Sequence, residues 1–310
     1  MWIVKNRIIF YILSALLFAV SFYGVFTYGF NQSIDFKGGT ITEIRYEGDY
    51  PPKSQIEGAL DLLEIGGYSV RPSGSDRYII RTKELTQEER QKFESTLLGV
   101  SSTHFTIERQ NTIGPVAGSE LKSKAMKAIV VVVLMIVLFI TFAFRGVSQA
   151  SLPRDTRGVA SWKYGMATVI ALIHDVVIPT GIFVFLGHYL GVEIDLLFVT
   201  GLLAILGYSV HDSIVVFDRV RENLRVNGED NIKEDFETLV GKSVNQTFAR
   251  SINTSLTIFI TLIALYLFGP AATKHFALLL TVGVIIGTYS SIFVASPLLV
   301  TFYKLQKGSK

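Results

Sequence analysis

Residues 126–144 read MKAIVVVVLMIVLFITFAF, a run in which Lys127 carries the only charge. A helix rises about 1.5 Å per residue, so about 20 apolar residues cross the roughly 30 Å hydrocarbon core of a bilayer. The chain contains six runs of this kind, and we expect six membrane-spanning helices. The runs cover residues 8–28, 126–144, 164–186, 194–217, 252–268 and 276–303.

The bulk composition supports this interpretation. Of the 310 residues, 49% are hydrophobic and 18% are charged, and the mean hydropathy is +0.42, which is too apolar for a soluble protein of this length. The chain has no cysteine, which excludes disulfides, thiolate metal sites and thiol redox chemistry. A signal peptide is the alternative for the first run, which follows Lys5 and Arg7. We interpret this run as a retained span, because its about 21 apolar residues exceed a typical h-region and no Ala-x-Ala cleavage site follows.

Lys and Arg residues concentrate in alternate connections between the runs, which predicts the orientation of the chain. They precede the first run, occupy the connections between the second and third and between the fourth and fifth, and end the chain. The two opposite short loops, 188–193 and 269–275, contain only Lys274. Both termini are therefore expected in the cytoplasm and residues 30–122 outside it. Basic clusters also occur in nucleic-acid-binding proteins, but beside membrane spans the topological explanation is favoured.

The segment 30–122 is the one substantial hydrophilic stretch, and its pattern predicts the order βαββαβ. Polar and apolar residues alternate in the strands, apolar residues recur at helical spacing in the helices, and Thr86 with Glu89 forms a capping box. The expected strands are 40–46, 68–71, 77–82 and 103–109, the helices are 52–65 and 86–98, and a turn covers 72–75. This order indicates a ferredoxin-like unit.

The predicted fold is therefore an α-helical membrane protein with six transmembrane helices and a small exported α+β domain of ferredoxin-like βαββαβ order. We divide the chain into a first transmembrane helix at 1–29, an exported domain at 30–122 and the remaining five helices at 123–310. A cytoplasmic loop is expected at 218–250.

Among the ionisable side chains within or beside the spans we single out His174, Asp175, His211, Asp212 and Arg250, and we interpret Glu193 and Asp195, at the outer end of the fourth run, as interfacial. Such groups cost several kcal/mol in hydrocarbon unless they face water, the bundle interior or a partner, so each is a functional candidate. Asp175 lies about 11 residues from the inner edge of its run, close to the membrane midplane. Asp212 and Arg250 share a similar depth near the inner boundary, which predicts that they are partners.

The Asp212–Arg250 pair has alternative interpretations. A static ion pair would only fix helix packing, and the long side chain of Arg250 can instead extend to the lipid headgroups. Small residues in the fourth run and the polar start of the fifth run, residues 251–257, favour a hydrated interior path. Burial disfavours a charged carboxylate and a guanidinium favours it, so small rearrangements can switch its proton occupancy. We therefore predict a proton pathway through Asp212, Arg250 and Asp175, with His174 and His211 as titratable neighbours.

Motifs of other chemistries are absent from the sequence. There is no Gly-x-x-x-x-Gly-Lys-Ser/Thr phosphate loop, no His-Glu-x-x-His zinc motif and no Gly-x-Ser-x-Gly hydrolase elbow. We therefore predict a proton-coupled transport subunit that is not an enzyme and has no ATPase site of its own.

Five motifs stand in order along the chain. They are IDFKGGT at 34–40, IGPVAG at 113–118, HD at 174–175, GYSVHDSIVVFDRVREN at 207–223 and RSINTS at 250–255. Together they resemble the SecD/SecF family of protein-export membrane proteins, within the resistance-nodulation-division (RND) superfamily, and the fourth-span motif resembles its SecF branch. The resemblance covers essentially the whole chain and places Asp35, Gly38 and Gly39 in the family's signature after the first span.

The resemblance implies a function and partners. In that family SecF and SecD together form a twelve-span pseudo-symmetric unit that works with the SecYEG channel, and proton flow drives movements of the exported domains that assist late translocation of preproteins. SecD, SecYEG, translocating preproteins and the lipid bilayer are thus the implied partners, without nucleic acid or organic cofactor, in the bacterial cytoplasmic (inner) membrane. The resemblance makes Asp212 the proton-responsive carboxylate and Arg250 its basic partner. His211 stands where SecF proteins usually have Asn.

Three functions remain open at the level of the sequence. The leading one is a subunit that converts proton-motive force into work on an exported polypeptide. The second is half of a proton-driven small-molecule or lipid exporter of the same superfamily, and the third is a scaffold whose exported domain only docks partners. The sequence also leaves open whether sodium replaces the proton.

Overall fold

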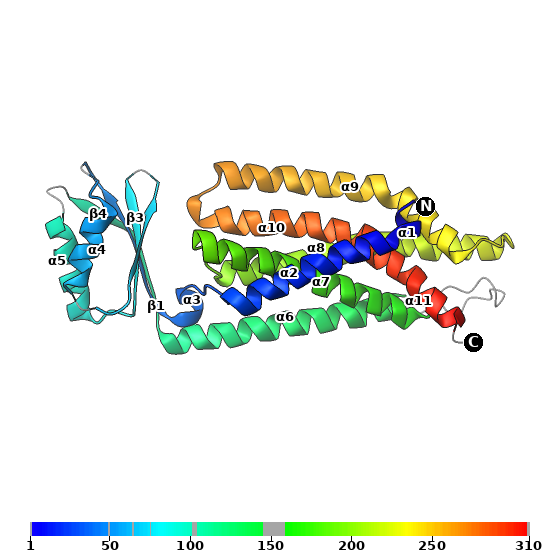
Figure 1. Ribbon diagram of the computed structural model, residues 1–310, viewed down its shortest axis with the longest axis horizontal. Helices are drawn as coiled ribbons and strands as arrows, with labels where there is room; N and C mark the ends of the chain where they lie inside the picture. Colours follow the sequence, from blue (N-terminus) through cyan, green and yellow to red (C-terminus); the bar gives the residue numbers. More distant parts are fainter. Residues whose placement is uncertain are drawn as a thin grey trace. The chain divides into compact units, whose positions relative to one another are not determined.

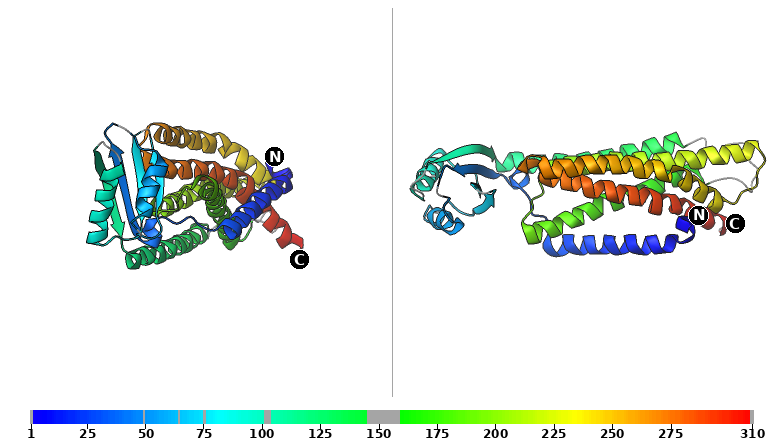
Figure 2. Two further views of the ribbon diagram at one scale, coloured as in Figure 1. Left: turned by 60° about the vertical axis from the view of Figure 1, so that its left-hand side comes forward. Right: turned by 90° about the horizontal axis from the view of Figure 1, so that it is seen from above.

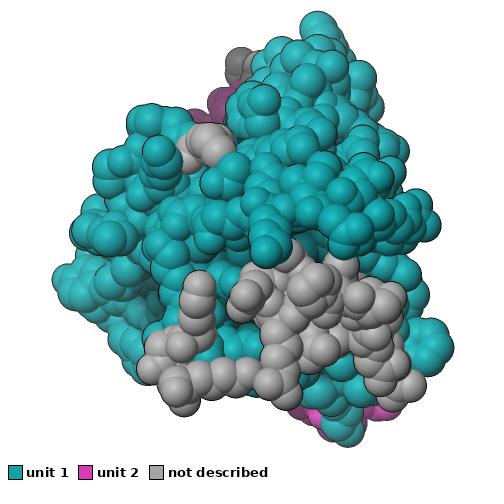
Figure 3. All heavy atoms as spheres, turned by 90° about the vertical axis from the view of Figure 1, so that its right-hand side faces the viewer, with its two compact units in different colours: residues 1–31, 127–310 teal, residues 32–126 magenta. Residues whose placement is uncertain are grey.

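The computed structural model describes residues 2–48, 50–63, 65–74, 76–100, 104–144 and 159–308. The chain divides into two compact units, which Figure 3 colours separately. One is a helical unit of residues 1–31 and 127–310, and the other is an α+β unit of residues 32–126.

The apolar helices lie in the helical unit, except that the first part of α6, up to Met126, belongs to the α+β unit. Their bounds are α1 Trp2–Lys5, α2 Arg7–Tyr28, α6 Pro115–Ala143, α7 Ser161–Leu190, α8 Leu196–Glu229, α9 Phe236–Phe268, α10 Ala271–Ser290, the π-helical turn η3 Ser291–Ala295 and α11 Ser296–Gly308 (Figure 1). Six stretches among the described residues, with α10, η3 and α11 counting as one, are long and apolar enough to cross a membrane. This finding confirms the six predicted spans.

The helices differ in how deeply they are buried. In the most apolar window of α7, α8 and α10–α11, half or more of the residues are buried (50, 56 and 61%), against 17% in α2 and 11% in α6 and in α9. Three spans therefore form the centre of the unit, and α2, α6 and α9 present most of their side chains outward. Figure 2 shows these long helices side by side, with α1 and α11 at the same end of the unit.

Several helices are longer than their apolar runs. The expected loop at 218–250 is largely helical, because α8 continues to Glu229 and α9 begins at Phe236, so that only 230–235 connects them. The extensions bury Val220 and Leu224 of α8 and Leu239 of α9 and carry polar residues on their other faces. An amphipathic helix of this kind has too low a mean hydropathy to be found by searching for apolar runs, which is why the predicted boundary was wrong.

Helices α8 and α10 approach each other closely because α10 has glycines at the contact. A Cβ atom on Gly283 would collide with the side chain of Ile205, and one on Gly287 would lie 3.3 Å from Cβ of Ser209. Small residues at such crossings let two backbones come together inside a membrane. The polar side chains of α8 and α10 are thereby brought within hydrogen-bonding distance.

The α+β unit has the predicted topology. Its elements are α3 Ile34–Lys37, β1 Gly39–Tyr46, α4 Lys53–Asp61, β2 Ser69–Ser73, β3 Arg77–Thr82, α5 Gln87–Val100 and β4 Phe105–Ile113. The strands form one antiparallel sheet in the order β2-β3-β1-β4, the arrangement of a ferredoxin-like fold. Ile44, Ile80, Leu60, Phe93 and Leu97 fill the core between the sheet and the two helices.

Two local predictions in this unit have different outcomes. The capping box is confirmed, because the Glu89 N–H donates to Oγ1 of Thr86 at 3.3 Å and the Thr86 N–H donates to Oε2 of Glu89 at 2.8 Å. The turn expected at 72–75 is shorter, because Pro72 and Ser73 still belong to β2. Pro72 can do so because β2 is an edge strand, where a missing N–H is tolerated. Ser75 and Thr103, the first residue of the last predicted strand, lie outside the described residues.

Candidate proton site in the helical unit

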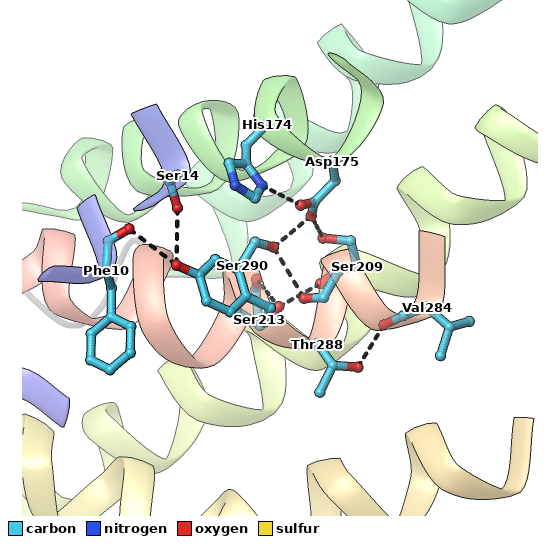
Figure 4. Close-up of polar contacts among 12 residues, drawn as sticks. Phe10, Ser14, His174, Asp175, Ser209, Ser213, Val284, Thr288 and Ser290 are labelled. Atoms are coloured by element: carbon cyan, nitrogen blue, oxygen red, sulfur yellow. Dashed lines mark hydrogen bonds and ion pairs between the residues drawn. The ribbon is translucent and has the colours of Figure 1, made fainter. Parts of the chain in front are cut away.

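Asp175 lies at the centre of a hydrogen-bonded cluster that joins α7, α8 and α10 (Figure 4). Its carboxylate is completely buried. One oxygen, Oδ2, accepts hydrogen bonds from Ser209 of α8 and from Ser290 of α10, the latter at 2.6 Å. The other oxygen, Oδ1, lies 2.9 Å from Nδ1 of His174. Both oxygens of Asp175 thus have protein partners, which is what a buried carboxylate requires.

His174 precedes Asp175 on α7 and is also buried. Its ring packs against that of Tyr289 with 6.0 Å between centroids, and its Nε2 atom has no hydrogen-bond partner among the described residues. The hydroxyl of Tyr289 accepts from Ser14 and donates to the carbonyl of Phe10, both on α2 (Figure 4). The cluster therefore reaches from the centre of the unit to its first span.

A second set of contacts ties α8 to the π-helical turn η3. The hydroxyls of Ser213 and Ser291 are 2.9 Å apart, and the Ser291 hydroxyl donates to the carbonyl of Ser209 at 3.2 Å. Ser296 then donates to the Ser291 carbonyl at 2.7 Å. Single π-turns inside α-helices are frequently found at functional sites, and this one directly follows Ser290, the partner of Asp175.

Asp212 of α8 is the second buried carboxylate, and its surroundings differ from those of Asp175. Only 5% of its surface is exposed, and Ser251 of α9, 2% exposed, faces it. Yet Oδ2 of Asp212 and Oγ of Ser251 both lack a hydrogen bond of regular geometry among the described residues. A carboxyl group relieves such an unsatisfied oxygen by taking up a proton, because the oxygen then becomes a donor. Asp212 is thus suited to binding and releasing a proton.

The expected ion pair between Asp212 and Arg250 is not formed in this structure. Arg250 is exposed and makes no ion pair within the part of the chain that the structure describes. The buried stripe of α9 runs through Val244, Thr247 and Ser251, so that Arg250, one residue before Ser251, is rotated about 100° away from it. His211 is exposed for the same reason beside Asp212.

Three hydroxyls near Asp212 were missed as a set by sequence reasoning. Tyr208 of α8, Ser255 of α9 and Thr288 of α10 come from three different spans and contact one another. Ser255 and Tyr208 stood in recognised motifs, but Thr288 gave no signal in the sequence, because a single Thr in an apolar helix commonly bonds to its own backbone. Only the packing of α10 against α8 and α9 brings the three together.

The signature residues after the first span form a compact corner in the α+β unit. The Asp35 N–H donates to Oγ of Ser33 at 3.1 Å, which starts the short helix α3, and Gly38 and Gly39 then adopt φ values of 79° and 129°. A Cβ atom on Gly38 would lie 2.7 Å from Cα of Pro115, and one on Gly39 would lie 2.6 Å from the carbonyl oxygen of Thr82. These positions therefore require glycine for structural reasons, and the corner packs against the IGPVAG motif.

None of the described His, Asp and Glu residues gather in a group of three that could hold a metal ion.

Comparison with known proteins agrees with this architecture. The family model of SecD/SecF protein export membrane proteins, C-terminal part, matches residues 92–152 and 159–305, and that of the SecD/SecF GG motif matches residues 23–49. Protein translocase subunit SecF of Thermobaculum terrenum is 39% identical over 97% of this chain and 93% of its own length. That of Anaerolinea thermophila is 34% identical over 96% and 92%.

Longer relatives show the same match. Protein translocase subunit SecDF of Thermus thermophilus is 34% identical over 100% of this chain, which corresponds to 40% of SecDF. A crystal structure of SecDF from Thermus thermophilus, a translocon-associated membrane protein, superposes with a TM-score of 0.79 at 32% identity over 97% of this chain, which spans 38% of that structure. Six apolar spans, a ferredoxin-like insertion after the first span and these similarities together show that the chain belongs to the SecD/SecF family of protein-export membrane proteins.

Proposed function

We propose that this protein is an accessory subunit of the Sec translocase that uses proton-motive force to assist late translocation of preproteins across the cytoplasmic membrane. SecD is the proposed partner within the membrane, because relatives exist in which the SecF-like part is fused to a SecD part in one SecDF chain. SecYEG and the translocating preprotein are the further proposed partners. Both termini and the α8–α9 connection lie on the cytoplasmic side in this proposal, and residues 30–122 lie on the other.

The observation that carries the proposal is the state of Asp212. It is an almost fully buried carboxylate with one oxygen that no described donor satisfies, on a helix packed between two others. Moving one charge across 100 mV of membrane potential supplies about 2.3 kcal/mol, which is enough to shift a conformational equilibrium about fiftyfold. Proton binding at Asp212 is the step that we propose for this coupling.

Arg250 and the Asp175 cluster have separate roles in the proposal. Arg250 directly precedes Ser251, which faces Asp212, so a rotation of α9 by up to about 100° would bring its long side chain toward the carboxylate. We assign Arg250 to the state in which Asp212 is charged, and the present structure to the state in which it is protonated. Asp175 and His174 of α7 form a second proton-binding group, which contacts α8 at Ser209.

The test replaces Asp212 with Asn, which keeps the shape but takes up no proton in this range. Membrane vesicles carrying the complete translocase would be assayed for preprotein translocation with and without an imposed proton gradient, after the ATP-dependent stage is complete. We expect Asp212→Asn to reduce the gradient-driven rate to the rate without a gradient. Asp218→Asn, at an exposed position on the same helix, is the matched control and should retain the stimulation.

Two substitutions of Arg250 distinguish the role of its positive charge from the role of its planar guanidinium group. Arg250→Lys retains the positive charge and should be milder than Arg250→Met.

Undiminished stimulation in Asp212→Asn would remove Asp212 from the mechanism and direct attention to Asp175. Gradient-driven efflux of small molecules without any effect on preproteins would favour the exporter function.

A further inference from the structure

Tyr208, Ser255 and Thr288 form a cluster of three hydroxyls, one from each of α8, α9 and α10. The Tyr208 hydroxyl lies 2.6 Å from that of Ser255 and 3.2 Å from that of Thr288, and the latter two are 2.6 Å apart. Ser255 and Thr288 are buried, and Tyr208 is half-buried. Each hydroxyl therefore has two hydroxyl neighbours inside the apolar part of the helical unit.

The hydrogen bonds of this cluster can be rearranged without moving any helix. Ser255 can donate to the carbonyl of Ser251 at 2.7 Å, and Thr288 can donate to the carbonyl of Val284 at 2.8 Å (Figure 4 shows the second of these bonds). Each hydroxyl has one proton but two lone pairs, so each can turn from its backbone acceptor to a hydroxyl neighbour. A chain of hydroxyls with alternative acceptors is what stepwise proton transfer requires.

The hydroxyl cluster lies one helical turn away from the Asp212–Ser251 pair, both along α8 and along α9. Tyr208 precedes Asp212 by four residues on α8, and Ser255 follows Ser251 by four residues on α9, which is about one helical turn or 6 Å in each case. Because α8 and α9 are joined by the short connection 230–235 and run antiparallel, these two offsets point in the same direction. The hydroxyl cluster is thus the next polar layer after the Asp212–Ser251 layer, toward the N-terminal end of α8.

Asp212 supplies the independent indication that protons move here. Asp212 and Ser251 are each more than nine-tenths buried, and among the described residues neither Oδ2 of Asp212 nor Oγ of Ser251 has a hydrogen bond of regular geometry. A proton reaches a buried carboxylate through polar side chains or water, and the immediate sequence neighbours of Asp212 on α8 are His211 and Ser213. The cluster one turn away provides such a path.

We propose that Tyr208, Ser255 and Thr288 are a hydroxyl relay that carries protons to and from Asp212. This inference rests on the proposed function of Asp212. In the loading step, the Tyr208 O–H bond breaks as its proton passes to the Asp212 carboxylate through one bridging water, and Tyr208 takes a proton from Ser255, which takes one from Thr288. The Thr288 hydroxyl takes its proton from a hydronium ion supplied from the proton-rich side, which leaves as water. Release runs in reverse, and no net charge stays on a hydroxyl.

The experiment compares Tyr208→Phe with Tyr11→Phe in the complete translocase. Both substitutions remove only a hydroxyl, and Tyr11 bonds to Thr301 at 3.1 Å on α11, away from this cluster. Translocation with and without a proton gradient would be measured in ordinary and in heavy water. We expect Tyr208→Phe to lower the gradient-driven rate on the order of tenfold or more, to change its solvent isotope effect, and to leave the gradient-independent rate unchanged. Tyr11→Phe should remain within about twofold of the wild type in every assay.

A second pair of variants guards against a purely structural loss. Ser255→Ala should reproduce the defect and Ser255→Thr, which keeps a hydroxyl, should not, even if Tyr208→Phe proves unstable. Wild-type gradient response in Tyr208→Phe, together with its loss in Asp212→Asn, would overturn the relay and leave the proposed function intact. A wild-type response in both would contradict the proposed function itself. Equal defects in Ser255→Ala and Ser255→Thr would also overturn the relay.

Discussion

The two buried carboxylates of the helical unit differ in how their oxygens are satisfied. Asp175 has Ser209, Ser290 and His174 as partners, whereas Asp212 keeps one oxygen without a regular hydrogen bond. A carboxylate with three partners is held in place and stabilises the packing of three helices. Asp212 has fewer constraints and is better placed to change its protonation state during a transport cycle.

This difference predicts distinct outcomes for substitutions at Asp175. Asp175→Ala leaves the hydroxyls of Ser209 and Ser290 and Nδ1 of His174 without their acceptor, and should destabilise the protein by about 3 kcal/mol or more. Asp175→Asn retains an acceptor oxygen and should be clearly milder. Thermal unfolding in detergent, followed by tryptophan fluorescence, would measure both. Equal stability of the two variants would show that these hydrogen bonds contribute little.

For individual residues, the sequence predicted which ionisable groups are buried, but it did not predict which side of its helix each candidate side chain faces. Asp175, His174 and Asp212 are buried as expected, because an ionisable residue within an apolar run has little alternative to the bundle interior. Arg250 and His211 point elsewhere, since a shift of one residue turns a side chain by about 100° around a helix. Burial of an ionisable residue in an apolar run is therefore predictable from sequence, whereas the side of the helix that it faces depends on packing between helices.

At the scale of single elements, the first turn of helix α5 carries a titratable carboxyl group, that of Glu89. The Lys83 ammonium, 2.9 Å from Oε1 of Glu89, and the Thr86 N–H lower the pKa of Glu89 to about 2. A carboxyl whose folded pKa is depressed stabilises the folded state above its unfolded pKa near 4.5, and this contribution is lost as the pH falls toward 2.

The prediction compares the wild type with Glu89→Gln, whose side chain does not titrate but can still close the capping box. The opening free energy of α5, from hydrogen exchange of its amides in the full-length protein, should be higher in the wild type at pH 6. The difference between the two proteins should shrink between pH 4.5 and pH 2. A difference that stays constant over this range would mean that the ionised form of Glu89 does not stabilise the helix.

Helices and strands were predicted well where one local pattern, either a long apolar run or the alternation of polar and apolar residues, determines the element. All six spans and the strand order of the α+β unit agree with the structure, because apolar length and alternation are determined by local residues. Boundaries were less accurate. Helix α6 begins at Pro115, well before its apolar run, and α8 and α9 continue as amphipathic helices. Such extensions depend on packing partners that no local pattern specifies.

For the whole molecule, the basic residues predict that both termini and the α8–α9 connection are cytoplasmic while residues 30–122 are exported. The absence of cysteine allows single cysteines to be introduced without further changes. A membrane-impermeant thiol reagent should label a cysteine at Ser75, which lies outside the described residues, only from the exported side. A cysteine at Asp230 should react only from the cytoplasmic side, and the reverse pattern would contradict the orientation.

The extension of α8 beyond its apolar run also gives this helix the geometry of a lever arm. Asp212 lies 17 residues before Glu229, the last residue of α8, which corresponds to about 26 Å of helix axis. A tilt of about 10° pivoting at Asp212 therefore displaces the tip by roughly 4–5 Å, and α9 returns from that tip to Ser251. A pair of spin labels, one on the 230–235 connection and one on α11, would report the protonation of the Asp212 carboxyl group as a change in the distance between the labels.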